Sequence, residues 1–339
     1  MREDSQSATD QASAAKPEII WERVNRRVRA ALLWTLSLIL LFVLAILPYV
    51  ASAYTVTLTF LIFFWVATAQ SWNLFSGYTG YVNFGYVGLV GVGAYTTAIL
   101  IGKFGAHWLP AVGAAGVVTA AFGFLIGIPL LRARGIYFAI AMLGLAEGLR
   151  VFFSMGFMAP LTGGGVGIGF ISGMSLEAKY YAMGLVALLT TVVVFVVANS
   201  RFGLQLLTIR EDELAAQVMG INTTSKKLMA FTLCAFLTGL AGGLYAAYVN
   251  YLVPATMFVT AYYTLIPIVM ATFGGLGTIL GPVVGAVLFT IISEAIWARF
   301  IFLHMVIFGA VLIIIILFMP QGIIPWLQDR RILPRTRWL

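Results

Sequence analysis

Residues 201–228 read RFGLQLLTIREDELAAQVMGINTTSKKL, and they form the only long polar segment that lies between two hydrophobic ones. Apolar residues recur at helical spacing from Leu207 to Met219, and acidic residues cluster near the start, which predicts a short helix. Gly220 and Asn222 predict its end. Two interpretations are open: the segment presents a charged helix to a soluble partner, or it is a solvated loop between membrane spans.

The rest of the chain is too apolar for a soluble protein. Of its 339 residues, 61% are hydrophobic and 9% are charged, whereas about a quarter of the residues in a soluble domain are charged. Only helices and closed barrels can span a bilayer, and runs such as VLIIIILF lack the alternation of a barrel strand. The composition therefore predicts an all-α polytopic membrane protein.

About ten transmembrane or half-spanning helices are predicted, with both termini in the cytoplasm. The expected spans fall at 30–47, 54–71, 86–101, 108–131, 135–154, 180–198, 229–249, 262–274, 277–297 and 299–319. Basic residues collect in the loops assigned to the cytoplasm, as the positive-inside rule requires. The chain is thus divided into a polar tail at 1–29, a membrane domain at 30–320 with a cytoplasmic loop at 201–228, and a basic tail at 321–339. Segment 262–274 contains Pro267 and is short, which favours a half-helix buried in protein.

Residues 70–98, QSWNLFSGYTGYVNFGYVGLVGVGAYTTA, contain more glycines than an ordinary span. The run from Gly77 to Gly80 predicts unwound backbone, and the later glycines predict close helix packing. Asn73 and Asn83 must find polar partners at or within the bilayer. Glycine-interrupted helices line substrate routes in transporters. Asn73, Gly77, Gly80 and Asn83 are therefore candidates for a substrate pathway.

Residues 131–150, LRARGIYFAIAMLGLAEGLR, place Glu147 inside an expected span. A carboxylate there is costly and marks a candidate functional site. Arg150 follows three residues later on the same helical face, so the two side chains can pair. The pair is either part of the substrate pathway or an ion pair that fixes helix packing.

The run TGGGVGIG at 162–169 is expected to be a glycine-rich loop on the outer side. The chain contains no GxxxxGK[ST] motif, so a phosphate-binding loop is rejected. Its two histidines predict no metal site, and no nucleophile–base pattern indicates catalysis. The basic residues flank spans and form no patch with aromatic residues, which argues against nucleic-acid binding.

Three of these stretches resemble the permease family of branched-chain amino acid (Liv-type) ABC importers. IREDELAAQVMGIN, followed by KLMAFTLCAFLTGLAGGLYA, is similar to the coupling loop and the helix after it. NLFSGYTG and RGIYFA, with the later Glu147 and Arg150, resemble two further patterns of that family. The resemblance extends over most of the chain from Asn73 to Leu327.

The resemblance implies a permease subunit in the inner membrane of a bacterium or archaeon, surrounded by lipid. Its implied partners are two cytoplasmic ATPase subunits that bind the ATP, a second homologous permease and a periplasmic binding protein, and no cofactor is expected in this chain. The residues implied at the ATPase contact are Arg210, Glu211, Glu213, Ala215, Ala216, Gly220 and Asn222. Binding-protein docking is implied at Thr162, Gly163 and Gly164, where a flexible connector is the competing interpretation.

Other functions remain open. Urea or short-chain amides are alternative substrates within the same family. An ion-coupled secondary transporter that uses Glu147, or a passive channel, would belong to a different class.

Overall fold

The computed structural model describes residues 42–299 and 322–330. The chain divides into two units, residues 1–56 and 57–339, which are described separately. The described part of the first unit contains a helix over 42–50 and the beginning of α2 (Ala53–Trp72). The tail at 1–29, the span expected at 299–319 and most of the one expected at 30–47 lie outside the described residues.

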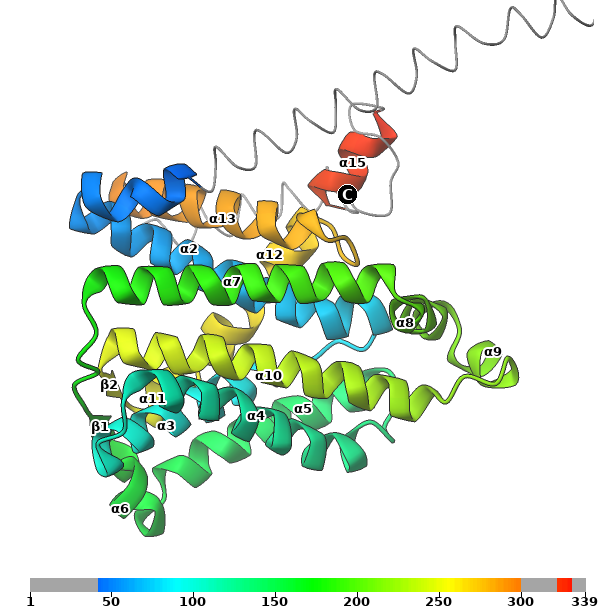
Figure 1. The fold of residues 1–339 in the computed structure, drawn as a ribbon. Helices are drawn as coiled ribbons and strands as arrows, with labels where there is room; N and C mark the ends of the chain where they lie inside the picture. Colours follow the sequence, from blue (N-terminus) through cyan, green and yellow to red (C-terminus); the bar gives the residue numbers. More distant parts are fainter. Residues whose placement is uncertain (1–41, 300–321, 331–339) are drawn as a thin grey trace, which may run out of the picture. The chain divides into compact units, whose positions relative to one another are not determined.

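Helices make up most of the described residues of the second unit (Figure 1). The longer helices after α2 are α3 (Tyr86–Phe104), α4 (Trp108–Leu130), α5 (Ile136–Ser154), α7 (Leu176–Asn199), α8 (Arg201–Glu211), α10 (Thr223–Val249), α12 (Ile266–Gly274) and α13 (Leu280–Arg299). The shorter ones are α6 (Ala159–Thr162), α9 (Glu213–Val218), α11 (Pro254–Met257) and α15 (Ile323–Asp329). Two π-helices, η1 (Asn73–Gly77) and η4 (Ala261–Leu265), and two 3-10 turns, η2 (Gly156–Met158) and η3 (Gly164–Val166), complete the helical elements. The short strands β1 (Ile168–Gly169) and β2 (Tyr251–Leu252) pair antiparallel.

Seven helical segments within the described residues are long and apolar enough to cross a membrane. They are Ala53–Gly77, Tyr86–Phe104, Trp108–Leu130, Ile136–Ser154, Leu176–Asn199, Thr223–Val249 and Pro254–Gly274. Leu280–Ile296, within α13, is a shorter apolar helix. The prediction of an all-α polytopic membrane protein is confirmed, while the side on which each terminus lies stays a prediction.

The prediction that the segment at 262–274 is a half-helix, too short to cross a membrane, is wrong, because the helical segment begins earlier. It starts at Pro254, passes through α11 and η4, and reaches Gly274, so that it covers 21 residues. Pro267 does not interrupt it. This proline lies in the first turn of α12, directly after the π-helix η4.

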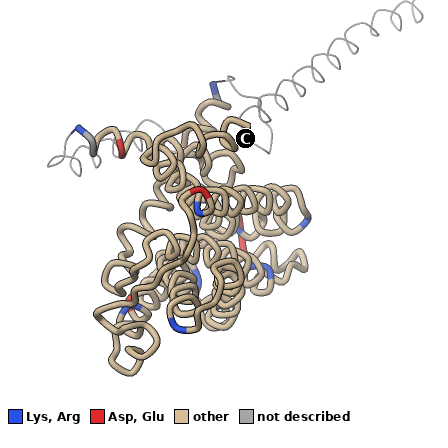
Figure 2. Tube along the Cα trace, turned by 60° about the vertical axis from the view of Figure 1, so that its left-hand side comes forward, with Lys and Arg blue, Asp and Glu red and all other residues tan. Residues whose placement is uncertain are grey.

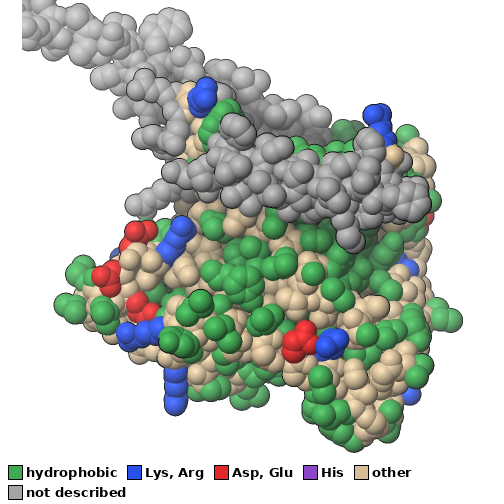
Figure 3. Space-filling model, turned by 180° about the vertical axis from the view of Figure 1, so that it is seen from behind, with side chains coloured by type: hydrophobic (Ala, Val, Ile, Leu, Met, Phe, Trp, Pro, Cys, Tyr) green, Lys and Arg blue, Asp and Glu red, His purple; other side chains and the backbone are tan. Residues whose placement is uncertain are grey.

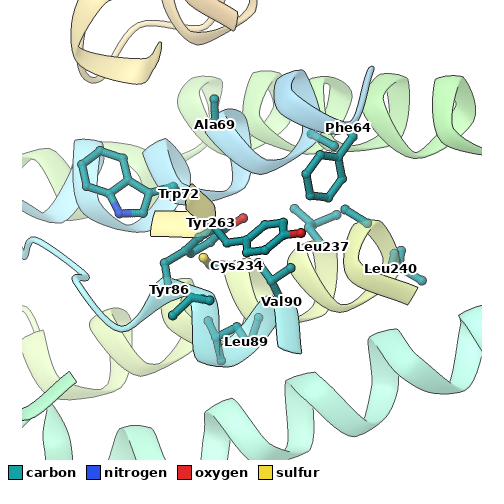
Figure 4. Packing of buried hydrophobic residues seen from close by; sticks show 14 of the residues in the cluster. Phe64, Ala69, Trp72, Tyr86, Leu89, Val90, Cys234, Leu237, Leu240 and Tyr263 are labelled. Carbon is teal, nitrogen blue, oxygen red and sulfur yellow. The ribbon is translucent and has the colours of Figure 1, made fainter. Parts of the chain in front are cut away.

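Helix α10 lies at the centre of the packing, against α3, α4 and α7. Small residues bring these backbones together. A Cβ atom on Gly239 would lie 2.6 Å from the carbonyl oxygen of Ala115, and one on Gly93 would lie 2.7 Å from the Cα of Gly239. Such distances leave no room for a larger side chain. Figure 4 shows the result, with Tyr86, Cys234 and Tyr263 close together between the helices.

Hydroxyl groups inside this core bond to one another. Tyr86 donates its hydroxyl to the carbonyl oxygen of Thr68 at 3.0 Å. The hydroxyl of Thr238 in α10 lies 2.9 Å from that of Tyr86, and Ser71 of α2 contacts both. These bonds join α2, α3 and α10 at one point, so the end of α2 has a fixed position.

The two ends of the long helices carry different loops. In Figure 1, α8 and α9 lie at one end of α7 and α10, while α6, β1 and β2 lie at the other. The polar segment at 201–228 and the glycine-rich run at 162–169 are therefore on opposite ends of this unit. We call residues 201–228 the central loop.

Candidate functional site: the central loop and the helix breaks beneath it

The central loop contains two short helices instead of the single helix predicted over 207–219. Asp212 adopts extended backbone angles between α8 and α9. Its carboxylate accepts hydrogen bonds from the backbone N–H groups of Leu214 at 2.8 Å and Ala215 at 3.0 Å. An aspartate is among the best helix N-caps, and this cap starts a new helix where the apolar spacing predicted continuity. Glu211 is the last residue of α8 and is exposed.

The predicted end of the helical region is in the right place. Gly220 has a φ of 80°, a left-handed conformation that favours glycine. Asn222 has a different role from the predicted one, because it begins the next helix. Its side chain accepts a hydrogen bond from the backbone N–H of Ser225 at 3.1 Å and caps α10.

Helix α9 turns its apolar side chains outward. Val218 is 89% exposed and Met219 is 78% exposed, and Leu214 and Ala215 are exposed beside them. Ala216 is buried instead, and it packs against the rest of the chain. Exposed apolar groups at the tip of a polar loop are typical of a protein contact surface. The sequence does not mark Val218 and Met219 as contact residues, because helical spacing identifies an apolar face without showing whether that face points inward.

Glu213 points back toward the membrane helices, where it joins a closed cluster. Its Oε1 accepts hydrogen bonds from Lys227 Nζ at 2.6 Å and from Thr223 Oγ1 at 3.1 Å. Its Oε2 accepts one from the hydroxyl of Tyr81 at 2.5 Å. Lys227 also donates to that hydroxyl at 3.0 Å. We call Tyr81, Glu213, Thr223 and Lys227 the buried cluster.

Charge in the buried cluster is balanced. Burial alone raises the pKa of Glu213, but the hydrogen bonds from Lys227 and Tyr81 outweigh it and leave the pKa below its ordinary value. Burial and the neighbouring carboxylate raise the pKa of the Tyr81 hydroxyl. Glu213 is therefore a carboxylate near neutral pH, and Tyr81 stays protonated as its donor.

Arg210, at the end of α8, reaches the end of the first broken helix. Its Nη1 donates to the carbonyl oxygen of Gly77 at 2.7 Å. The last carbonyls of a helix have no partner within it, so a guanidinium is a favourable donor there. Arg210 also packs against Gly80, where a Cβ atom would lie 3.2 Å from its Cγ. Unwinding begins at Gly80, which has a φ of 76°, and not at Gly77 as predicted, because Gly77 lies in the π-helix.

Asn73 bonds to a second break in the helices. Its Nδ2 donates to the carbonyl oxygen of Thr278 at 2.9 Å, and its Oδ1 accepts from the N–H of Gly277 at 2.9 Å. A Cβ atom on Gly77 would lie 2.0 Å from that same Oδ1, so the glycine makes room for the asparagine. We call residues 80–85 the first break and residues 275–279 the second break.

Asn83 differs from Asn73, since its side-chain amide has no hydrogen-bond partner within the described residues although it is buried. Only its backbone is bonded: its N–H donates to Ser76 Oγ at 3.2 Å, and its carbonyl oxygen accepts from Trp72 Nε1 at 3.1 Å. A buried amide with free bonding capacity is costly. Among the four pathway candidates of this region, Asn83 therefore keeps the capacity to bind a solute or water.

Glu147 and Arg150 form the ion pair that their spacing predicted, with 2.8 Å between Oε2 and Nε. The pair lies apart from the central loop on the outer face of α5, where both side chains are about half exposed. Gly144 and Gly148 beside it have open space around them. Figure 3 shows one face of the molecule, on which hydrophobic side chains cover wide areas and charged ones are few. Figure 2 shows the same scarcity of charge along the trace.

Comparisons with known proteins identify the family of the chain. Residues 54–316 match the family described as branched-chain amino acid transport system, permease component. The chain belongs to this family of permeases. It is 29% identical to the high-affinity branched-chain amino acid transport system permease protein LivM of Escherichia coli, over 86% of this chain and 75% of that protein.

The LivM protein of Salmonella typhimurium shows the same identity and coverage. A probable LivM protein of Methanocaldococcus jannaschii is 23% identical, over 75% of this chain and 88% of that protein. No solved structure matches. The resemblance seen in the sequence is confirmed, and the chain is a multi-pass membrane protein of a permease family.

In this permease, the glycine-rich run forms a tightly bonded turn. Thr162 is buried and donates its hydroxyl to the carbonyl oxygen of Phe153 at 2.9 Å. The N–H of Gly164, which is also buried, donates back to Thr162 Oγ1 at 3.1 Å. Gly163 has a φ of 76° and no room for a side chain. The predicted docking residues therefore hold the turn, while the neighbouring Val166 is exposed at this end of the permease.

Proposed function

We propose that the chain is the permease subunit of an ATP-driven importer that carries branched-chain amino acids across the cytoplasmic (inner) membrane. Its family and the names of its relatives support the substrate class. The observation that carries the coupling role is the outward-facing apolar side of α9, formed by Leu214, Val218 and Met219. A membrane protein gains nothing from exposing such side chains to water unless another protein covers them.

The assembly that follows has four kinds of subunit. Two cytoplasmic ATPase subunits bind ATP, and one of them contacts α9 through Ala215, Val218 and Gly220. A second, homologous permease completes the membrane part. A periplasmic binding protein delivers the solute to the opposite end, where the turn at 162–169 lies. ATP is hydrolysed by the ATPase subunits and not by this chain.

The solute pathway is proposed to include Asn83 and the outer face of α5. Asn83 has a buried amide without a partner within the described residues. Glu147 and Arg150 present a half-exposed charged pair within a span. A pair in that place must face protein or a water-filled passage, because hydrocarbon solvates it poorly. A passage between this chain and the second permease satisfies that requirement.

Reconstitution of the whole complex in liposomes tests the proposal. Leucine uptake is expected only when ATP is present on the side of the ATPase subunits and the binding protein on the other. Uptake driven by an ion gradient without ATP would identify a secondary transporter, and downhill flux without ATP a passive channel. Preference for urea or acetamide over leucine would change the substrate class.

A substitution in α9 tests the contact itself. Val218→Asp is expected to reduce co-purification of the ATPase subunits by about tenfold, since it places a charge in an apolar contact. Thr224→Asp is the matched control, because Thr224 is also exposed in the central loop. Equal loss of ATPase subunits in both variants would assign the effect to charge in the loop and not to the α9 contact.

A further inference from the structure

Two interrupted helices meet beneath the central loop. The first break, residues 80–85, follows η1, and the second break, residues 275–279, follows α12. Gln70 donates to the carbonyl oxygen of Ile279 at 2.6 Å. Asn73 adds two hydrogen bonds, to Gly277 and Thr278. Each break also follows a π-helix in the same span, an element often found at functional sites. The second break is therefore bonded to the helical turns of α2 and η1 that precede the first break.

Arg210 of α8 touches both breaks. Its guanidinium bonds to the carbonyl oxygen of Gly77 in η1, and its Cγ lies against Gly80, where the first break begins. A Cβ atom on Gly277, in the second break, would lie 2.7 Å from its Nη1. Glycine at that position thus leaves just enough space for the guanidinium. One side chain from the central loop fits between the two interrupted helices.

Glu213 of α9 bonds to the first break at a second point. Its carboxylate accepts the hydroxyl of Tyr81, which lies within that break. The same carboxylate is fixed to Lys227 at the beginning of α10. Lys227 also lies over the Tyr81 ring, with Nζ 4.3 Å from its centroid. The first break is consequently held between Arg210 at Gly77 and Glu213 at Tyr81.

We infer that Arg210 and Glu213 are positioning residues that transmit movement of the central loop to the two breaks. The inference rests on the proposed function and adds the route by which the ATPase subunits act on the solute pathway. The contact surface of α9 faces outward, whereas Arg210 packs against Gly80 and Glu213 bonds to Tyr81, both within the first break. Asn83, the proposed solute contact, lies two residues beyond Tyr81. Displacement of α8 and α9 must therefore move the first break or rupture these bonds.

The test compares ATP hydrolysis with leucine uptake in the complete reconstituted complex. Arg210→Ala is expected to keep the ATPase subunits bound and hydrolysing, and to reduce leucine taken up per ATP by at least about fivefold. Glu213→Gln retains a hydrogen-bonding side chain and is expected to give a smaller reduction. Arg201→Ala is the control, because it removes a positive charge from the exposed start of the same helix.

A distance measurement separates transmission from a general loss of structure. Spin labels at Val82→Cys and Leu280→Cys, both partly exposed beside the two breaks, are placed in a Cys234→Ser background. ATP is expected to change the distance between the labels when Arg210 is present and to leave it unchanged with Arg210→Ala. An unaltered ATP response together with unaltered uptake per ATP in Arg210→Ala would overturn the inference. Absence of ATP-driven uptake in the wild-type complex would instead overturn the proposed function.

Discussion

Two acid–base pairs in the described part of the permease, Lys227–Glu213 and Arg150–Glu147, lie in opposite surroundings. Lys227 and Glu213 are 2.6 Å apart, with side chains only 2% and 15% exposed. Arg150 and Glu147 are 2.8 Å apart, with side chains 45% and 48% exposed. The first pair is completed by Tyr81 and Thr223 of the same chain. The second lies on the outer face of α5, next to two glycines with open space.

The difference shows which polar contacts this chain completes by itself. A buried charge is tolerated when its partner and further hydrogen bonds surround it, and the Lys227–Glu213 pair meets that condition. An exposed pair in water contributes little to stability, but within a membrane span it is costly unless it faces protein or water. The buried cluster is thus completed by residues of this chain, whereas the α5 pair requires another protein surface or water beside it.

The largest expected effect comes from breaking the buried pair. Lys227→Met leaves Glu213 without its cation, and loss of one member of a buried pair costs about 3–5 kcal/mol. The thermal unfolding midpoint of the purified chain in detergent measures this loss. Lys226→Met is the control, because Lys226 is less buried and its Nζ lies over the ring of Phe202, 5.8 Å from the centroid. Equal thermal unfolding midpoints for the two variants would show that the Lys227–Glu213 pair does not stabilise the fold.

The second-largest effect is expected from neutralising one member of the α5 pair. Arg150→Gln leaves a single charge on α5, which costs about 2.5–3.5 kcal/mol at the centre of a membrane helix. We expect less assembled complex, measured as second permease recovered with the tagged chain. The double variant Glu147→Gln, Arg150→Gln is expected to restore assembly while uptake stays about tenfold reduced. Full recovery of uptake in the double variant would assign the pair to helix packing and remove it from the pathway.

Acid should weaken the contribution of the buried Lys227–Glu213 pair. The folded-state pKa of Glu213 lies below its ordinary value of 4.5. Its contribution to stability is therefore complete above pH 4.5 and is lost as the pH falls through the folded-state pKa. The unfolding midpoint of the wild type is expected to fall more between pH 6 and pH 3.5 than that of Glu213→Gln. Parallel curves for the two proteins would show that Glu213 does not contribute in this way.

The smallest expected effect on the isolated chain is that of Gly148→Leu. Nothing lies within 4 Å of a Cβ atom at this position, so the unfolding midpoint should change by less than the equivalent of about 1 kcal/mol. The same substitution should weaken recovery of the second permease, because it fills the space beside the pair. Gly239→Leu is the contrasting variant, since its site is already closed by α4. Unchanged assembly with Gly148→Leu would place the second permease on another face.

Local signals in the sequence accounted for most element boundaries. Gly220 ended the helical region where its φ of 80° requires glycine, and the three-residue spacing of Glu147 and Arg150 gave their contact. The predicted helix boundaries were wrong where a single side chain changed where a helix begins. Asp212 capped a second helix inside an apolar repeat, and Pro267 lies in the first turn of α12 where a break was predicted.

The sequence alone determined the class of the protein, because apolar runs of span length leave a helix as the only way to satisfy the backbone in a bilayer. It also marked the central loop, since charge in such a chain is rare enough to be noticed. Tertiary structure decided which side chains met: Asn73 with Gly277 and Thr278, Arg210 with Gly77, and Glu213 with Tyr81 and Lys227. No spacing rule predicts these contacts, because all except Glu213 with Lys227 join segments far apart in the chain through the packing of α2, α3, α10 and α12. For the same reason, only the fold showed that α9 turns its apolar residues outward and its glutamate inward.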